Sequence, residues 1–169
     1  IDIASVSALE DASRGEGAFA GDPANTCYFI ANGTYQQSGS SLILYIVRGG
    51  SSVGPRAFVG ATRQGVVIRG RATIDDGADN VVLSNMTFDL TGYSQSGSFN
   101  TVTVNHASNV TVSQVSLTGD CSTGYKGGHI ESDGASGLTV DSCLIEKFGH
   151  CASGGHEDHG IYLANGSNI

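Results

Sequence analysis

Apolar and polar residues alternate along short runs of this chain, and three of these runs begin in the same way. Each starts with a turn residue followed by an aliphatic one, as in Asn80-Val81, Asn109-Val110 and Gly137-Leu138. A fourth, Asn168-Ile169, begins where the sequence ends. The aliphatic residues of successive runs lie about 30 residues apart, and self-similarity at a period of this size indicates a stacked repeat architecture.

The repeat aligns equivalent residues of successive coils in columns. Side chains alternate across a strand, so two columns are predicted to point inward: Val102 with Ile130 and Ile161, and Val104 with Ser132 and Leu163. The columns between them are predicted to point outward: Thr101 with His129 and Gly160, Thr103 with Glu131 and Tyr162, and Asn105 with Asp133 and Ala164.

The runs are short strands, separated by turns that leave no room for crossover helices. Successive coils must therefore pair strand on strand in parallel. This predicts an all-β fold, a right-handed parallel β-helix (solenoid). A β-sandwich is the alternative, but it would favour a hairpin turn about every 10 residues over the long period seen here.

The segment 1–40 differs from the rest. Ser7-Ala8-Leu9-Glu10 has the spacing of a capping box, which predicts a short N-terminal helix over 7–13, closed by Gly15. Such a helix would cover the exposed end of the stack. The apolar run 27–31 predicts a strand, and Asn32-Gly33 predicts the turn after it. We therefore divide the chain into a cap with the first coil (1–40) and further coils (41–169), with strands at 41–47, 65–70 and 72–74.

Composition narrows the function classes. The formal charge is −8, and no cluster of Lys or Arg is present to neutralise phosphates, which excludes a nucleic-acid partner. No apolar run approaches the roughly 20 residues of a membrane span. The chain has no initiating Met and no signal peptide, so we expect a mature or trimmed product. Its four cysteines fit an exported protein with disulfides, secreted or at the cell surface; buried thiols in a cytosolic protein are the alternative.

Two of the cysteines occupy equivalent places in adjacent coils. Cys121 and Cys151 would have Cα atoms about 5 Å apart, inside the range of a disulfide. We expect this bridge, with a pair of stacked free thiols as the alternative. Whether the remaining two, Cys27 and Cys143, pair with each other is left open.

Four of the five histidines lie between residues 129 and 159. Stacking of the coils would put Asp120 near His150 and gather His129, His156 and His159 in one surface region. One interpretation is a site for an acidic sugar, in which His129 or His159 moves a proton while carboxylates or a cation hold the substrate. The substrate-binding candidates are His156, Asp133, Asp158 and Tyr162.

Three other interpretations of the same region stay open. A glycoside hydrolase needs paired carboxylates, which Glu131 could form with Asp133 or Asp158. A zinc site could use His156, Asp158 and His159, although their spacing is not that of the helical His-Glu-x-x-His motif. These residues could also be polar turn residues without a chemical role.

Aromatic and basic residues add two further candidates. A sugar-stacking platform could consist of Phe88, Phe148 and Tyr162, with inward packing as the alternative for the two phenylalanines. Most of the positive charge lies early in the chain, at Arg56, Arg63, Arg69 and Arg71. Arg69 and Arg71 alternate, which predicts one shared strand face. That face would contact an acidic glycan or simply be solvated.

Two segments carry a family resemblance. The cap and residues 28–35 resemble the first coil of pectin-lyase-like β-helix proteins, and 159–169 look like a strand-turn-strand of secreted right-handed β-helix repeat proteins. In the polysaccharide lyases of this superfamily the base is usually Lys or Arg, often with calcium bound by acidic residues. Carried onto this chain, the resemblance implies Lys126 as base, with Glu131 and Asp133 as calcium ligands.

These observations favour an extracellular carbohydrate-associated protein, with a polysaccharide as partner and lyase or hydrolase activity toward an acidic glycan. The alternative is a non-catalytic structural or adhesive module. Ile169 falls where a strand should continue, and an open coil edge invites pairing with another chain. Under this alternative, copies assemble end to end.

Overall fold

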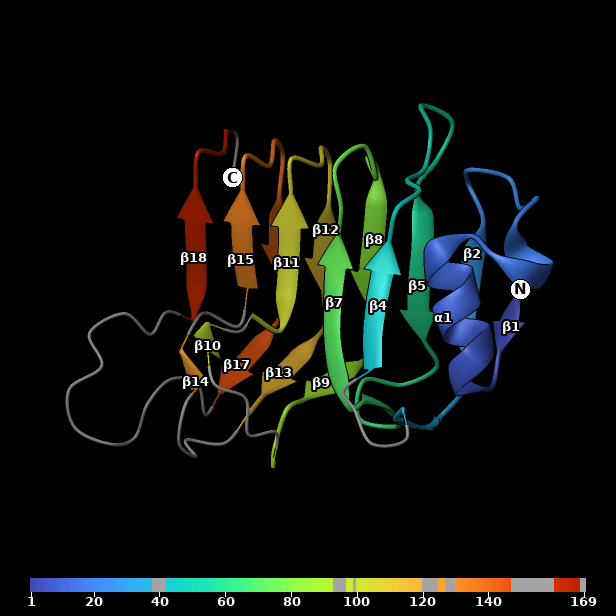
Figure 1. Cartoon of the computed structure of the whole chain (residues 1–169), viewed down its shortest axis with the longest axis horizontal. Coiled ribbons are helices and arrows are strands. Elements are labelled where there is room, and N and C mark those ends of the chain that lie inside the picture. Colours follow the sequence, from blue (N-terminus) through green and yellow to red (C-terminus); the bar gives the residue numbers. More distant parts are fainter. Residues whose placement is uncertain are drawn as a thin grey trace.

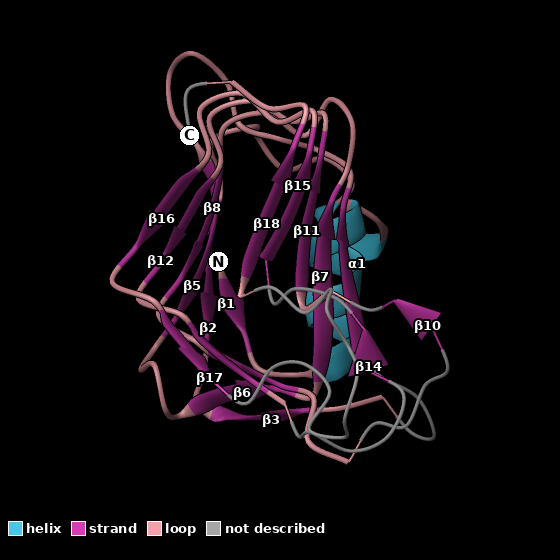
Figure 2. Cartoon of the chain, turned by 90° about the vertical axis from the view of Figure 1, so that its left-hand side faces the viewer, coloured by secondary structure: helices cyan, strands magenta, loops and turns pink. Residues whose placement is uncertain are grey.

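The computed structural model of the chain is a parallel β-solenoid with one short α-helix near its N-terminus (Figure 1). It describes residues 1–37, 42–92, 97–98, 100–119, 125–126, 130–146 and 160–167, with the backbone alone at 42–43, 97–98 and 125–126. Viewed from the side of its last described coil, the strands form three sheets around a common interior (Figure 2). The predicted all-β solenoid is therefore confirmed.

Each regular coil contributes one strand to each of three sheets. Sheet A contains β1 (Asp2–Ile3), β2 (Cys27–Ile30), β5 (Arg56–Gly60), β8 (Val81–Ser84), β12 (Thr111–Ser113) and β16 (Thr139–Asp141). Sheet B contains β3 (Gly33–Tyr35), β6 (Val66–Ile68), β9 (Thr87–Asp89), β13 (Ser116–Thr118) and β17 (Leu144–Glu146). Sheet C contains β4 (Leu42–Ile46), β7 (Gly70–Ile74), β11 (Val102–Asn105), β15 (Ile130–Asp133) and β18 (Ile161–Ala164). A separate parallel pair joins β10 (Gly97–Ser98) to β14 (Tyr125–Lys126).

The strand register confirms the two inward columns and the outward columns of Thr103 and Asn105. The third outward column is not confirmed: Thr101, which precedes β11, is 0% exposed, so its predicted outward position is wrong, and His129 lies outside the described residues. Val102 pairs with Ile130, which pairs with Ile161, and Val104 is aligned with Ser132 in the same way. The inward residues of β7, β11 and β15 are fully buried, while their outward neighbours are partly exposed. Ile161 and Leu163 of β18 remain 42% and 43% exposed, because no further described coil covers them.

Residues in the left-handed backbone region form columns as well. Asn80, Asn109 and Gly137 have φ of 55°, 55° and 71° at the same turn of three successive coils. Asparagine and glycine tolerate this conformation better than other residues do. The turn residues that open each repeat in the sequence are therefore the residues that this corner of the coil requires.

The N-terminal cap confirms the predicted helix and corrects its start. Helix α1 spans Val6–Arg14, buries Leu9 and ends at Gly15 with φ 65°, as expected for a glycine C-cap. The N-cap is Ser5 rather than Ser7, because the Ser5 hydroxyl accepts a hydrogen bond from the Ala8 amide at 3.2 Å. A short 3₁₀ helix, η1 (Gly17–Phe19), follows, and α1 packs beside β4, the edge strand of sheet C (Figure 1).

The early arginines lie in different surroundings, and the one prediction made about their faces is wrong. Arg56 is 2% exposed, and its guanidinium donates to the Tyr28 hydroxyl at 2.9 Å and to backbone carbonyl oxygens of the cap. Arg69 and Arg71 do not share a face. Arg69 follows β6 and bonds Asp89 of sheet B at 2.5 Å, whereas Arg71 lies on β7 in sheet C. The coil turns a corner at Arg69, between β6 and β7.

Candidate functional site

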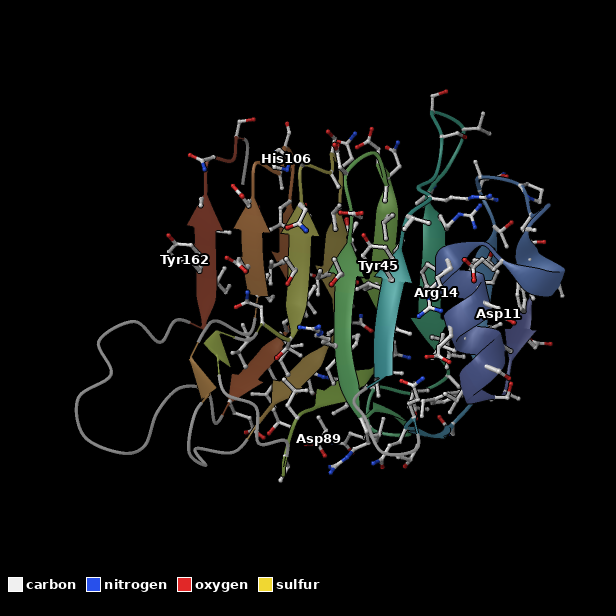
Figure 3. The ribbon with its side chains drawn as sticks, in the orientation of Figure 1. Asp11, Arg14, Tyr45, Asp89, His106 and Tyr162 are labelled. Atoms are coloured by element: carbon white, nitrogen blue, oxygen red, sulfur yellow. The ribbon has the colours of Figure 1, made fainter. Side chains whose placement is uncertain are left out.

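The outward face of sheet C carries a continuous row of polar side chains. We call it the tyrosine row, and it runs across all five strands in register: Tyr45, Thr73, Thr103, Glu131 and Tyr162. Its two end residues are the exposed aromatics, at 38% and 44%. They stand at opposite ends of the sheet (Figure 3). Four strand spacings separate them, about 19 Å along the solenoid axis.

A second row lies two residues further along the strands. Asn105, Asp133 and Ala164 are aligned on β11, β15 and β18, and Asp75 follows β7 at the same level. Glu131 of the tyrosine row and Asp133 of this row therefore share the outward face of one strand. Their Cα atoms are about 7 Å apart by strand rise. The predicted carboxylate pair is thus on one face.

Each of these two carboxylates is held by an amide from elsewhere in the stack. The Asn100 amide donates to Glu131, and the Asn165 amide donates to the Asp133 Oδ1 at 3.1 Å. Amide N–H donors fix the orientation of a carboxylate. The pair is consequently an ordered group of two carboxyl side chains on β15, one strand in from β18.

The opposite end of the face is organised by Tyr45. Its hydroxyl donates to the Asp75 Oδ2 at 2.5 Å. This hydrogen bond raises the pKa of Tyr45 and lowers the pKa of Asp75, which also receives hydrogen bonds from the Asp76 backbone and the Asn105 side chain. The phenol therefore stays neutral, and its ring is tied to the neighbouring coil.

The structure brings together three of the residues that the sequence singled out. Glu131, Asp133 and Tyr162 lie on the outward face of sheet C. Lys126 belongs to β14, which pairs with β10 and not with sheet C, and only its backbone is described. The remaining candidates lie outside the described residues: Asp120, Cys121, His129, Phe148, His150, Cys151, His156, Asp158 and His159. Their predicted roles, including the Cys121–Cys151 bridge, stay predictions.

No metal centre is assembled by the part of the chain that the structure describes. Within it, no three side chains of the His, Cys, Asp and Glu types come close enough to hold an ion. Glu131 and Asp133 could supply two oxygen ligands, whereas calcium takes about six to eight. Calcium at this pair would need further ligands, and it stays a prediction.

The two cysteines that the sequence left unassigned are both free thiols. Cys27 is exposed on β2, and Cys143 is half-buried. Burial raises the pKa of the Cys143 thiol. No disulfide is present among the described residues.

Phe88 is fully buried, so the inward alternative is confirmed for this phenylalanine, and it cannot stack on a sugar.

Sequence reasoning missed the half of the site that comes from the earlier coils, namely Tyr45, Thr73 and Asp75. The alignment of coils began at Val102 and was not extended upstream. Successive members of the tyrosine row keep the period of about 30 residues that marks the repeat, so the same period reaches Thr73 and then Tyr45. Continuing the columns by two coils points to both residues, but the coils differ in length, so their register with Tyr162 is fixed only by the pairing of the strands.

Comparisons of the chain with family models, with curated proteins and with solved structures gave no match. In the described part of the chain, no helix has both the length and the apolar character needed to cross a membrane. The fold and the geometry of sheet C are therefore the observations from which function is argued.

Proposed function

We propose that this chain is an extracellular carbohydrate-binding β-helix of the pectin-lyase-like type, and that a linear polysaccharide lies along the tyrosine row. The observation that carries the proposal is the row itself. Two exposed tyrosines stand about 19 Å apart at the ends of one straight line of side chains. Threonine hydroxyls and one carboxylate lie between them.

The side chains of this row match the chemistry of a sugar chain. A tyrosine ring offers an apolar face together with a polar edge, which suits the C–H face and hydroxyls of a pyranose. The hydroxyls of Thr73 and Thr103 and the Glu131 carboxylate can exchange hydrogen bonds with sugar hydroxyls. The row is perpendicular to the strands, so a bound polymer would follow the solenoid axis.

Binding is the first test. We expect Tyr162→Ala to weaken binding of a recognised polysaccharide by about 3- to 10-fold, which is the contribution of one aromatic contact. The measurement is calorimetry or affinity electrophoresis against a panel of neutral, uronate and amino polysaccharides. The matched control is Phe29→Ala, because Phe29 is 47% exposed on β2 of sheet A, a different sheet. Equal losses from both variants, or binding to no polysaccharide, would refute the proposal.

Glycoside hydrolysis at this face is a second candidate, favoured by the Glu131–Asp133 pair. The two residues share the outward face of one strand, which places two carboxyl groups on the same side, and an inverting hydrolase needs its two carboxyl groups roughly 6.5–9.5 Å apart. The lyase alternative, with Lys126, His129 or His159 moving the proton, predicts unsaturated products from a uronate polymer. Reducing-sugar release without ultraviolet-absorbing products supports the hydrolase, the converse supports the lyase, and neither signal supports a binding module.

A further inference from the structure

The described charges on the outward face of sheet C are mostly negative. Asp75, Glu131 and Asp133 contribute three carboxylates, and Arg71 on β7 contributes one guanidinium. The two carboxylates of β15 are flanked on β11 by Thr103 and Asn105, and on β18 by Tyr162 and Ala164. Among these described neighbours no side chain is cationic.

The other arginines of this region are engaged away from this part of the face. Arg56 is buried against Tyr28 and the cap. Arg63 donates to the hydroxyl of Ser116, the first residue of β13 in sheet B, at 2.8 Å and to the carbonyl of Val115 just before it. Arg69 is paired with Asp89. Arg14 and Arg48 belong to the cap end, where Arg48 donates to the Ala20 carbonyl. These arginines are therefore not available to neutralise the two carboxylates of β15.

We infer that the glycan on the tyrosine row carries protonated amino groups, as a linear glucosamine polymer does. This inference rests on the proposed function and names its substrate class. The tyrosines define the site and the length of chain that fits, and the charges select among glycans of that shape. An ammonium group placed over β15 gains two carboxylates that are already held in position by amides. A uronate at the same place meets like charge and needs a bridging cation.

The size of the selectivity follows from the exposure of the site. An exposed ion pair contributes about 1.5- to 5-fold in affinity, and the contribution shrinks as salt screens it. With two carboxylates available, we expect a glucosamine tetramer to bind about 3- to 20-fold more tightly than its fully N-acetylated counterpart. The two ligands share one backbone and differ at the amino group, which acetylation both neutralises and enlarges, so the carboxylate variants are needed to assign the difference to charge.

The experiment measures the binding of three tetramers by calorimetry at low salt: glucosamine, N-acetylglucosamine, and galacturonate with calcium or with a chelator. The glucosamine preference should disappear in the double variant Glu131→Gln/Asp133→Asn and in high salt. The control variant is Asp141→Asn, since Asp141 is an exposed carboxylate on sheet A. This variant distinguishes binding at the outward face of sheet C from a general attraction of cationic ligands to an acidic protein. Circular dichroism confirms the fold of each variant.

The outcomes are distinguishable. A glucosamine preference that the double variant loses and Asp141→Asn keeps supports the inference. Equal binding of the two amino-sugar tetramers, or tighter binding of tetragalacturonate with or without calcium, overturns the inference and leaves the proposed function standing. A preference that Asp141→Asn removes equally overturns it as well. Failure of every tetramer, and of the polymer panel, overturns the proposed function itself.

Discussion

Replacing Ser132 should stabilise the protein, although it is one of the most deeply buried residues. Ser132 lies on β15 and points inward, in register with Ile74 and Val104 on the preceding coils and with Leu163 on the next. It is 0% exposed, and its hydroxyl has no hydrogen-bond partner among the described residues. Every other described coil places an aliphatic residue at this position of sheet C.

The expected gain in the free energy of unfolding follows from the buried surroundings of the Ser132 hydroxyl. A buried hydroxyl without a partner costs about 1–3 kcal/mol. Ser132→Ala removes that cost without adding volume, so we expect a gain of about 1 kcal/mol in the free energy of unfolding. Ser132→Val also buries additional apolar surface, which contributes about 0.8 kcal/mol per buried carbon. Valine in addition has a higher strand propensity than serine. The gain should reach about 2 kcal/mol unless overpacking offsets it.

The assay is urea unfolding followed by circular dichroism and by tyrosine fluorescence, with thermal melts in parallel. A gain of about 1 kcal/mol should raise Tm by about 2–4 °C for a chain of this size. Thr103→Val is the matched control, because Thr103 faces outward on the neighbouring strand and should change stability by less than about 0.5 kcal/mol. A loss of stability in Ser132→Ala would refute the reasoning, since it would show that the hydroxyl has a partner.

Two further predictions test the cap and a turn. Tyr28→Phe should destabilise the fold by about 1–3 kcal/mol in urea unfolding, because it leaves the buried Arg56 guanidinium without its hydroxyl acceptor. Burial raises the pKa of Tyr28 from its ordinary 10.0 to about 12, so the neutral phenol stabilises the native state below pH 10 and this contribution is lost toward pH 12. Wild type should therefore lose more stability than Tyr28→Phe over that interval, and equal losses would contradict the assignment. Gly134→Ala should cost more than Gly92→Ala: both glycines have positive φ, but only at Gly134 would the new Cβ lie 2.6 Å from the His106 ring. Equal melting temperatures for the two variants would show that crowding by His106 is absent.

Local alternation was enough to predict which side of each strand faces the interior. Val102 and Ile130 are buried, and Thr103 and Glu131 face outward, because adjacent side chains of a strand point to opposite faces whatever lies around them. The left-handed turn residues and the glycine at the end of α1 were also predictable from local properties. Each depends on the backbone conformation of one residue.

The sequence could not predict which side chains of neighbouring coils contact each other. Arg56 reads as a surface residue, yet it is buried because an earlier coil supplies Tyr28 and the carbonyl oxygens that satisfy the guanidinium. Arg69 and Arg71 fit one face by alternation, but Arg69 lies at the corner after β6 and bonds Asp89 of sheet B, whereas Arg71 lies on β7 of sheet C. Burial and pairing of this kind depend on which side chains and backbone carbonyl groups of another coil pack beside the residue.

The sequence by itself therefore determined the repeat, the inward columns and one strand of the site, Glu131 with Asp133, because these follow from strand alternation and from the regular period of the coils. Only the tertiary structure decided that Tyr45 and Tyr162 end a single row. Five strands from five coils of unequal length must first be aligned by their backbone hydrogen bonds. That row is a property of the stack and of no single segment of the chain.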